Sequence, residues 1–244
     1  MTPVLTVSEL SVQIAGSRIL HGVGFEVAAT GVTALLGRNG VGKTTTVRSV
    51  LGLLPDGGRV TGGRIVFDGR DITREATHRI VCGGIGYAPE DRGVFAHLTV
   101  AENLALAERP GSAHHYDLVH DLFPELHTRR HQRAGTLSGG QQQMVAIGRT
   151  LLNDNRLIIV DEPTKGLAPR VVTEVAEVLE RAAERVPLLL VEQNLAVVRR
   201  LAHDAVVLDA GHVVHTGGAQ ELLADRELAT ALLGVASRTA PGAA

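Results

Sequence analysis

Apolar and polar residues along the chain form two alternating patterns, which are short apolar runs and longer helical repeats. Apolar runs of four or five residues, bounded by Gly, Pro or charged residues, are typical of strands buried in a parallel sheet. Their alternation with helical patterns predicts an α/β fold around a mostly parallel sheet. We expect the first two strands, and also the last two, to form antiparallel hairpins. The expected strands cover residues 4–14, 24–27, 33–36, 85–87, 157–160, 188–191, 205–208 and 213–215.

The helical patterns divide the chain into a core and an insert. A helix is expected to begin near Lys43, and a second, amphipathic helix is expected over residues 171–182. Residues 98–152 show helical patterns without a strand-like run, which predicts a helical subdomain inserted in one domain that spans residues 1–235. Residues 236–244 are small and polar, and we expect them to form a flexible tail.

Composition narrows the class of protein. The chain has 244 residues, 44% of them hydrophobic, and a net charge of −2, so it lacks the basic surplus of a dedicated nucleic-acid-binding protein. The single Cys82 excludes a disulfide framework, and no apolar run is long enough to span a membrane. The N-terminal residues do not resemble a secretory signal, so we expect a cytoplasmic protein. Of the 24 basic residues only two are lysines, Lys43 and Lys165.

A glycine-rich segment between an expected strand and an expected helix predicts a phosphate site. Residues 37–44 read GRNGVGKT and match the pattern G-x-x-x-x-G-K-[ST] in the context that this pattern requires. Glycines allow backbone N–H groups to surround phosphate oxygens, Lys43 can reach the β- and γ-phosphates, and the Thr44 hydroxyl can bind Mg²⁺. The nucleotide-binding residues expected here are Gly37, Arg38, Asn39, Gly40, Val41, Gly42, Lys43, Thr44 and Thr45.

Two carboxylates follow the buried run at residues 157–160. In P-loop NTPases an Asp in this place holds Mg²⁺ beside the phosphate loop, so we expect Asp161 to be a metal ligand. The adjacent Glu162 can then polarise an attacking water as general base. A glutamate beside the expected Mg²⁺ ligand favours water as the acceptor of the phosphoryl group. The pair therefore predicts ATP hydrolysis rather than phosphorylation of another molecule.

Residues 137–143 read LSGGQQQ and predict the start of a helix with Ser138 as its N-cap. This segment resembles the signature of the ATP-binding-cassette (ABC) ATPases, and the order of phosphate loop, helical insert, signature and Asp-Glu pair is similar to that family over residues 4–223. The resemblance implies a P-loop NTPase cassette in which a RecA-like core and an antiparallel β subdomain carry the helical subdomain. It also implies a head-to-tail dimer, in which the signature of one subunit contacts the ATP of the other. The signature residues are Ser138, Gly139, Gly140 and Gln141.

Residues 88–92, 166–169 and 191–194 resemble the ATPases of branched-chain amino-acid importers, in particular the second, shorter of their two ATPases. This resemblance implies ATP and Mg²⁺ as cofactors, a second ABC ATPase subunit of the same or a different chain, transmembrane permease subunits, and indirectly a periplasmic or extracellular solute-binding protein. The expected location is the cytoplasmic face of the cell membrane, through the permease. No nucleic-acid partner is expected.

Three alternatives stay open at this stage. ATPases of urea or amide importers, or of lipid-linked export, are very similar to those of amino-acid importers, so the resemblance indicates the class of ATPase but leaves these cargoes open. A non-transport ABC protein of DNA repair or translation needs a long coiled-coil insert or a second cassette, and 244 residues contain neither. A catalytically silent cassette would lack Lys43 or Glu162, and this chain has both.

Four positions depart from the usual pattern of ABC ATPases. Glu90 stands where most have a glutamine, and we expect it to contact Mg²⁺ or its water shell. Gln193 stands where most have a histidine, and we expect it to sense the γ-phosphate as a neutral donor. Ala15 lies where a ring usually stacks on adenine, which predicts weaker ATP binding or replacement stacking by Arg18. Lys165 follows Glu162 closely. Two interpretations stay open for it: a contact with the partner subunit or with a phosphate, and a solvated lysine on a loop.

Overall fold

The fold is described by a computed structural model that places residues 2–234. Its central sheet has six strands, and every neighbouring pair is parallel except the pair of β10 with β9. The expected α/β class with a mostly parallel sheet is therefore confirmed. In their order across the sheet, the strands are β10 (His212–Gly218), β9 (Asp204–Asp209), β3 (Val32–Leu36), β8 (Leu188–Val191), β7 (Leu157–Asp161) and β6 (Ile85–Ala88).

A second sheet of four antiparallel strands lies beside the first. Its strand β2 begins at Ser17 rather than near residue 24, and strands β4 and β5 were not expected from the sequence. The reason for the second difference is that β4 reads GRVTGGRIVF, in which glycines and arginines hide the alternation of buried and exposed positions. In their order, the strands are β2 (Ser17–Val27), β1 (Leu5–Ile14), β4 (Gly58–Phe67) and β5 (Arg70–Asp71).

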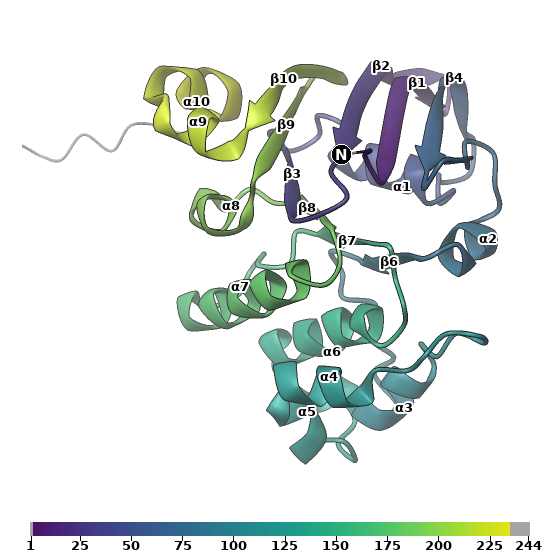
Figure 1. The fold of residues 1–244 in the computed structure, drawn as a ribbon, viewed down its shortest axis with the longest axis vertical. Helices are drawn as coiled ribbons and strands as arrows, with labels where there is room; N and C mark the ends of the chain where they lie inside the picture. The colour runs from purple at the N-terminus through teal and green to yellow at the C-terminus, as the bar shows by residue number, and fades with distance from the viewer. Residues whose placement is uncertain (1, 235–244) are drawn as a thin grey trace, which may run out of the picture.

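Helices cover the faces and one end of the molecule (Figure 1). From residue 98 to 152 the regular elements are helices, which lie at the opposite end of the molecule from the antiparallel sheet. They are α3 (Val100–Ala105), α4 (Tyr116–Leu122), α5 (Pro124–Thr128), a 3₁₀ turn (Ala134–Thr136) and α6 (Gly139–Leu151). The others are α1 (Lys43–Val50), α2 (Thr77–Cys82), α7 (Pro169–Ala183), α8 (Leu195–Leu201), α9 (Ala219–Ala224) and α10 (Arg226–Leu233).

Alternate side chains of the central strands enter two hydrophobic cores. Val160 and Leu190 pack with α6 and α7 in one core, whereas Ile159 and Leu189 pack with α1 and the antiparallel sheet in the other. Each strand is thus buried on both faces, which explains its continuous apolar sequence. The amphipathic helix expected over residues 171–182 is α7, and its apolar stripe faces the first core.

Two further observations concern membrane-spanning helices and the expected C-terminal tail. No helix among the described residues has the length and apolar character needed to cross a membrane. The flexible tail expected at residues 236–244 lies outside the described residues.

Candidate nucleotide and magnesium site

The carboxyl ends of three neighbouring parallel strands create the site. Strand β8 lies between β3 and β7, with Leu35 and Asp161 both in register with Val191. The loops that leave these strands therefore start at the same edge of the sheet, which is where ligands bind in open α/β sheets. The strand ends and these loops carry the predicted phosphate loop, the Asp161–Glu162 pair and Gln193.

The phosphate loop connects β3 directly to α1. Gly42 is the N-cap of α1 and has φ 112°, a left-handed conformation that an L side chain rarely adopts. A Cβ on Gly42 would also lie 2.6 Å from Leu20 Cδ2. Glycine at position 42 is therefore required by the backbone as well as by the chemistry expected of the loop.

Lys43 is the only strongly buried cation of this loop. Its Nζ donates hydrogen bonds to the carbonyl oxygens of Gly37 (2.8 Å) and Arg38 (2.9 Å). Burial lowers the pKa of Lys43, an effect that the nearby Glu162 and Asp161 oppose. Lys43 is thus held at the centre of the loop with its charge next to the two acids.

A cavity of about 680 Å³ contains all three residues expected to hold Mg²⁺, namely Thr44, Glu90 and Asp161. Asp161 is 1% exposed, and its Oδ1 has no hydrogen-bond partner among the described residues. Burial, followed by the charges of Glu162 and Glu90, raises the pKa of Asp161 to about 6. Carboxylate and hydroxyl oxygens are the ligands that Mg²⁺ prefers, and an unpaired buried carboxylate oxygen fits this ion.

Glu162 has a contact on each of its carboxylate oxygens, with Gln193 at Oε1 and with Lys165 at Oε2. Gln193 Nε2 donates to Glu162 Oε1 (2.5 Å) and lies 2.6 Å from Asn39 Oδ1 in the phosphate loop. Glu162 also has a φ of 46°, a strained conformation for a residue other than glycine. Gln193 therefore joins the phosphate loop to the expected general base.

Lys165 contacts acids of its own chain. Its Nζ lies 2.5 Å from Glu90 Oε1 and 3.3 Å from Glu162 Oε2, although the lysine side chain is 55% exposed. These two contacts raise the pKa of Lys165. Both lysines of the chain thus lie beside the acids of the candidate site.

The four signature residues lie at the start of α6, outside the cavity that Asp161 lines. Ser138 is the N-cap of α6, as expected, and forms a reciprocal capping box with Gln141. Gly140 packs closely on α7, since a Cβ there would lie 2.5 Å from Val171 Cγ1. Within the described chain, the signature and the phosphate loop do not form one site.

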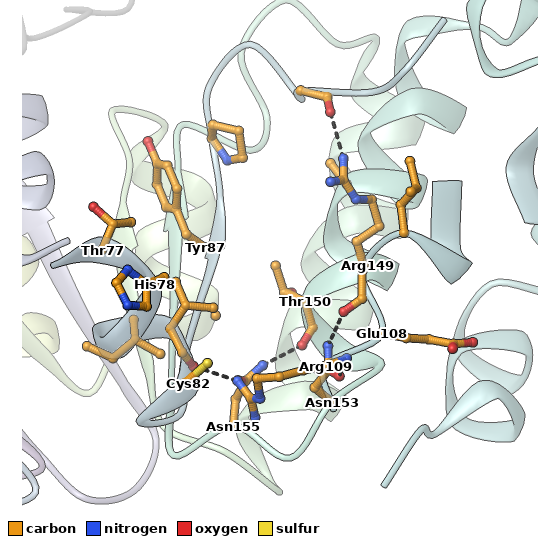
Figure 2. Close-up of a pocket in the computed structure, with 18 of the residues that line it drawn as sticks. Thr77, His78, Cys82, Tyr87, Glu108, Arg109, Arg149, Thr150, Asn153 and Asn155 are labelled. Atoms are coloured by element: carbon orange, nitrogen blue, oxygen red, sulfur yellow. Dashed lines mark hydrogen bonds between the residues drawn. The ribbon is translucent and has the colours of Figure 1, made fainter. Parts of the chain in front are cut away.

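A second cavity of about 900 Å³ lies between α2 and β6 on one side and the ends of α3 and α6 on the other (Figure 2). Two arginines bridge its sides. Arg109 donates to the carbonyl oxygen of Val81 (2.7 Å), and Arg149 donates to that of Gly93 (2.6 Å). This cavity, called the groove below, lies between the segment after Glu90 and the helices of residues 98–152.

The site contains three polar residues that sequence reasoning did not include. The Tyr87 hydroxyl lies 3.5 Å from Asp161 Oδ2, and burial raises the pKa of this tyrosine. Thr164 and Glu192 are buried and hydrogen-bonded to each other. Glu192 carried a usable signal, because it follows a buried strand directly, just as Asp161 follows the hydrophobic part of β7.

Thr45 and Ala15 line neither of these two cavities. Thr45 follows Thr44 in the first turn of α1, where its carbonyl oxygen accepts a hydrogen bond from the Ser49 hydroxyl. Ala15 lies in the turn between β1 and β2, with φ 48° and an exposed side chain.

Comparison with known proteins identifies relatives over most of the chain. The profile of the family described as ABC transporter matches residues 20–165. The high-affinity branched-chain amino acid transport ATP-binding protein BraG of Pseudomonas aeruginosa is 36% identical over 94% of this chain and 99% of its own length. A solved ATP-binding cassette of an ABC transporter in its ADP conformation has a TM-score of 0.77 at 26% identity, covering 96% of this chain and all of that one.

Other relatives carry the names of other cargoes. The molybdenum import ATP-binding protein ModC of Rhizobium etli is 37% identical over 83% of this chain and 60% of its own length. The lipopolysaccharide export system ATP-binding protein LptB of Escherichia coli is 29% identical over 94% of this chain and 97% of its own length.

Proposed function

This chain belongs to the ABC transporter family, whose ATP-binding domains hydrolyse ATP, and from this premise we propose that it powers an importer of branched-chain or related amino acids. The observation that carries the ATP-hydrolysing part of this proposal is the arrangement at the strand ends. A buried carboxylate with an unpaired oxygen, Asp161, lies next to a second carboxylate, Glu162, which Gln193 connects to the phosphate loop.

The proposed chemistry assigns one task to each group. Backbone N–H groups of residues 37–42 and the Lys43 ammonium bind the phosphates of ATP. Thr44, Asp161 and Glu90 would hold Mg²⁺, and the bound ion would neutralise negative charge on the phosphates. Glu162 accepts a proton from the water that attacks the γ-phosphorus, while the bond to the β–γ bridging oxygen breaks.

The placement of the signature supports a dimer. Ser138, Gly139, Gly140 and Gln141 lie outside the cavity of their own chain, and we propose that they contact ATP held by a second ATPase subunit, either an identical or a different chain. ATP would close this dimer and hydrolysis would reopen it.

Coupling to a membrane partner is assigned to the groove in Figure 2. Its walls come from the segment that follows Glu90 and from the helices of residues 98–152. A permease segment bound there would therefore contact both parts of the chain. Such binding would place the chain on the cytoplasmic face of the membrane, with a solute-binding protein acting through the permease.

The cargo rests on the resemblance of residues 88–92, 166–169 and 191–194 and on BraG, whereas ModC and LptB show that similar cassettes serve other cargoes. Purification of the intact complex with its permeases, followed by ATPase measurements with candidate solutes, decides between them. Stimulation by a branched-chain amino acid supports the proposal. Stimulation only by urea, an amide, molybdate or a lipid would assign another cargo.

The dimer has its own test. Glu162→Gln is expected to bind ATP without hydrolysing it, so light scattering should show ATP-dependent dimers of this variant. Lys43→Ala, which removes the phosphate contact, should remain monomeric under the same conditions. A Glu162→Gln variant that stays monomeric at saturating ATP, alone and with its permeases, would contradict the proposed closure.

A further inference from the structure

Glu192 is a buried acid for which the proposed chemistry has no task. It follows β8 directly, lies next to Gln193, and is 3% exposed. Its Oε1 accepts hydrogen bonds from the backbone N–H groups of Gln193 (2.8 Å) and Asn194 (2.9 Å). Its Oε2 accepts a hydrogen bond from the Thr164 hydroxyl (2.8 Å), which is also buried.

These three donors explain why a carboxylate can be buried here. An unpaired buried charge is strongly unfavourable, whereas hydrogen bonds to an ionised group are shorter and stronger than neutral ones. Removing the Thr164 hydroxyl would leave Oε2 without its donor, and removing the Glu192 carboxylate would leave two backbone N–H groups without an acceptor. The contact between the two loops is therefore costly to break.

The Glu192–Thr164 contact runs beside the contact between Glu162 and Gln193. Thr164 is two residues beyond Glu162, and Glu192 directly precedes Gln193, so two successive side-chain bonds join the same two loops. A third bond, from the backbone N–H of Glu162 to the carbonyl oxygen of Val191 (2.8 Å), anchors their base. Together these bonds limit how far the loop of Gln193 can move relative to Glu162.

We propose that Glu192 is a positioning residue for ATP hydrolysis, which holds the loop of Gln193 through Thr164 so that the Gln193 amide reaches both Glu162 and Asn39. The inference rests on the proposed function, because it assumes that Gln193 and Glu162 act in hydrolysis. It adds a physical link between the loop that follows Glu162, which includes Lys165, and the residue expected to sense the γ-phosphate.

A purely structural role for Glu192 makes a different prediction. Glu192 also accepts from Asn194, the N-cap of α8, and could do no more than stabilise the start of that helix. Loss of such a contact would lower the melting temperature without changing kcat for ATP. The two roles therefore differ in kinetics rather than in stability.

The decisive experiment is a double-mutant cycle between Thr164→Val and Gln193→Ala in the full chain. Thr164→Val keeps the shape of the side chain and removes only the hydroxyl donor. We expect kcat to fall roughly tenfold in Thr164→Val, with KM for ATP within about twofold of wild type. In the Gln193→Ala background the same substitution should change kcat by less than about twofold. The Thr164–Glu192 hydrogen bond acts through the Gln193 amide, which this variant lacks.

Two further variants complete the design. Thr164→Ser, which keeps a hydroxyl, should restore most of the lost turnover. Thr33→Val provides a matched control, because Thr33 is equally buried in β3 but lies outside the network of Glu192, and it should leave kcat unchanged.

The outcomes separate the possible failures. An unchanged kcat in Thr164→Val, or a loss that is fully additive with Gln193→Ala, would overturn the positioning role even if hydrolysis itself is confirmed. Full turnover in Gln193→Ala alone would also overturn the role, since it would remove Gln193 from hydrolysis. Wild-type protein that fails to hydrolyse ATP with its permeases would instead overturn the proposed function.

Discussion

Asp161→Asn is expected to stabilise the fold while it impairs Mg²⁺ binding. The carboxylate of Asp161 is buried beside Glu162 and Glu90, and this environment raises its pKa from 3.8 to about 6. A rise of this size corresponds to about 3 kcal/mol that the ionised group costs the folded state at pH 7.5 without metal. Asparagine removes the charge but leaves a buried amide to be paired, so we expect a net gain of about 1–3 kcal/mol.

The pH dependence gives the sign of this effect. An acid whose pKa is higher in the folded state binds its proton more tightly there, so the cost is fully present above pH 6 and falls as the pH drops toward 3.8. At pH 5 the cost is about half of its value at pH 7.5. The advantage of Asp161→Asn should shrink accordingly.

The assay is chemical denaturation in EDTA at pH 7.5 and at pH 5, followed by the same measurement with excess Mg²⁺ and ADP. Ligand binding to the folded state should stabilise wild type more than Asp161→Asn. Asp91→Asn serves as the control, since Asp91 lines the same cavity but is exposed, and it should change stability by less than about 0.5 kcal/mol. A variant less stable than wild type at pH 7.5, or a gain of the same size at pH 5, would refute the reasoning.

Three further substitutions test other parts of the structure. Lys165→Met removes a cation that contacts two acids of the site, Glu90 and Glu162. Mn²⁺, a spectroscopic probe measured with ADP present, should therefore bind this variant several-fold more tightly than wild type. Lys165→Arg keeps the cation and should not show this gain. Gly140→Ala places a Cβ 2.5 Å from Val171 and should cost about 1–3 kcal/mol in thermal or urea unfolding, whereas Gly62→Ala, with more space, should cost less. Ala15→Tyr supplies a stacking ring and should tighten ATP binding about fivefold by calorimetry; an unchanged affinity would count against a missing platform.

The phosphate loop and the acidic strand end could be predicted because local sequence determines both. The glycines at residues 37–42 are needed by the loop backbone itself, and the spacing of Lys43 and Thr44 follows from the helix that begins there. Asp161 ends a strand that is buried on both faces, and a continuous apolar run reports this burial directly. The central sheet was predicted for the same reason.

Other features depend on which elements become neighbours. The sequence of β4 has few apolar positions, and its pairing with β1 becomes apparent only when both strands are in the sheet. The contacts of Lys165 with Glu90 join residues 75 positions apart and depend on the adjacency of β6 and β7. Composition shows that lysine is rare in this chain, but only the fold shows that both lysines lie beside the same acids.

The role of Glu162 as general base is the central claim, and phosphate release at saturating Mg²⁺ and ATP tests it most directly. The comparison is between wild type and Glu162→Gln, with equal nucleotide binding verified for both. We predict that turnover falls by about 100-fold or more in the variant. Turnover within about twofold of wild type would contradict the account.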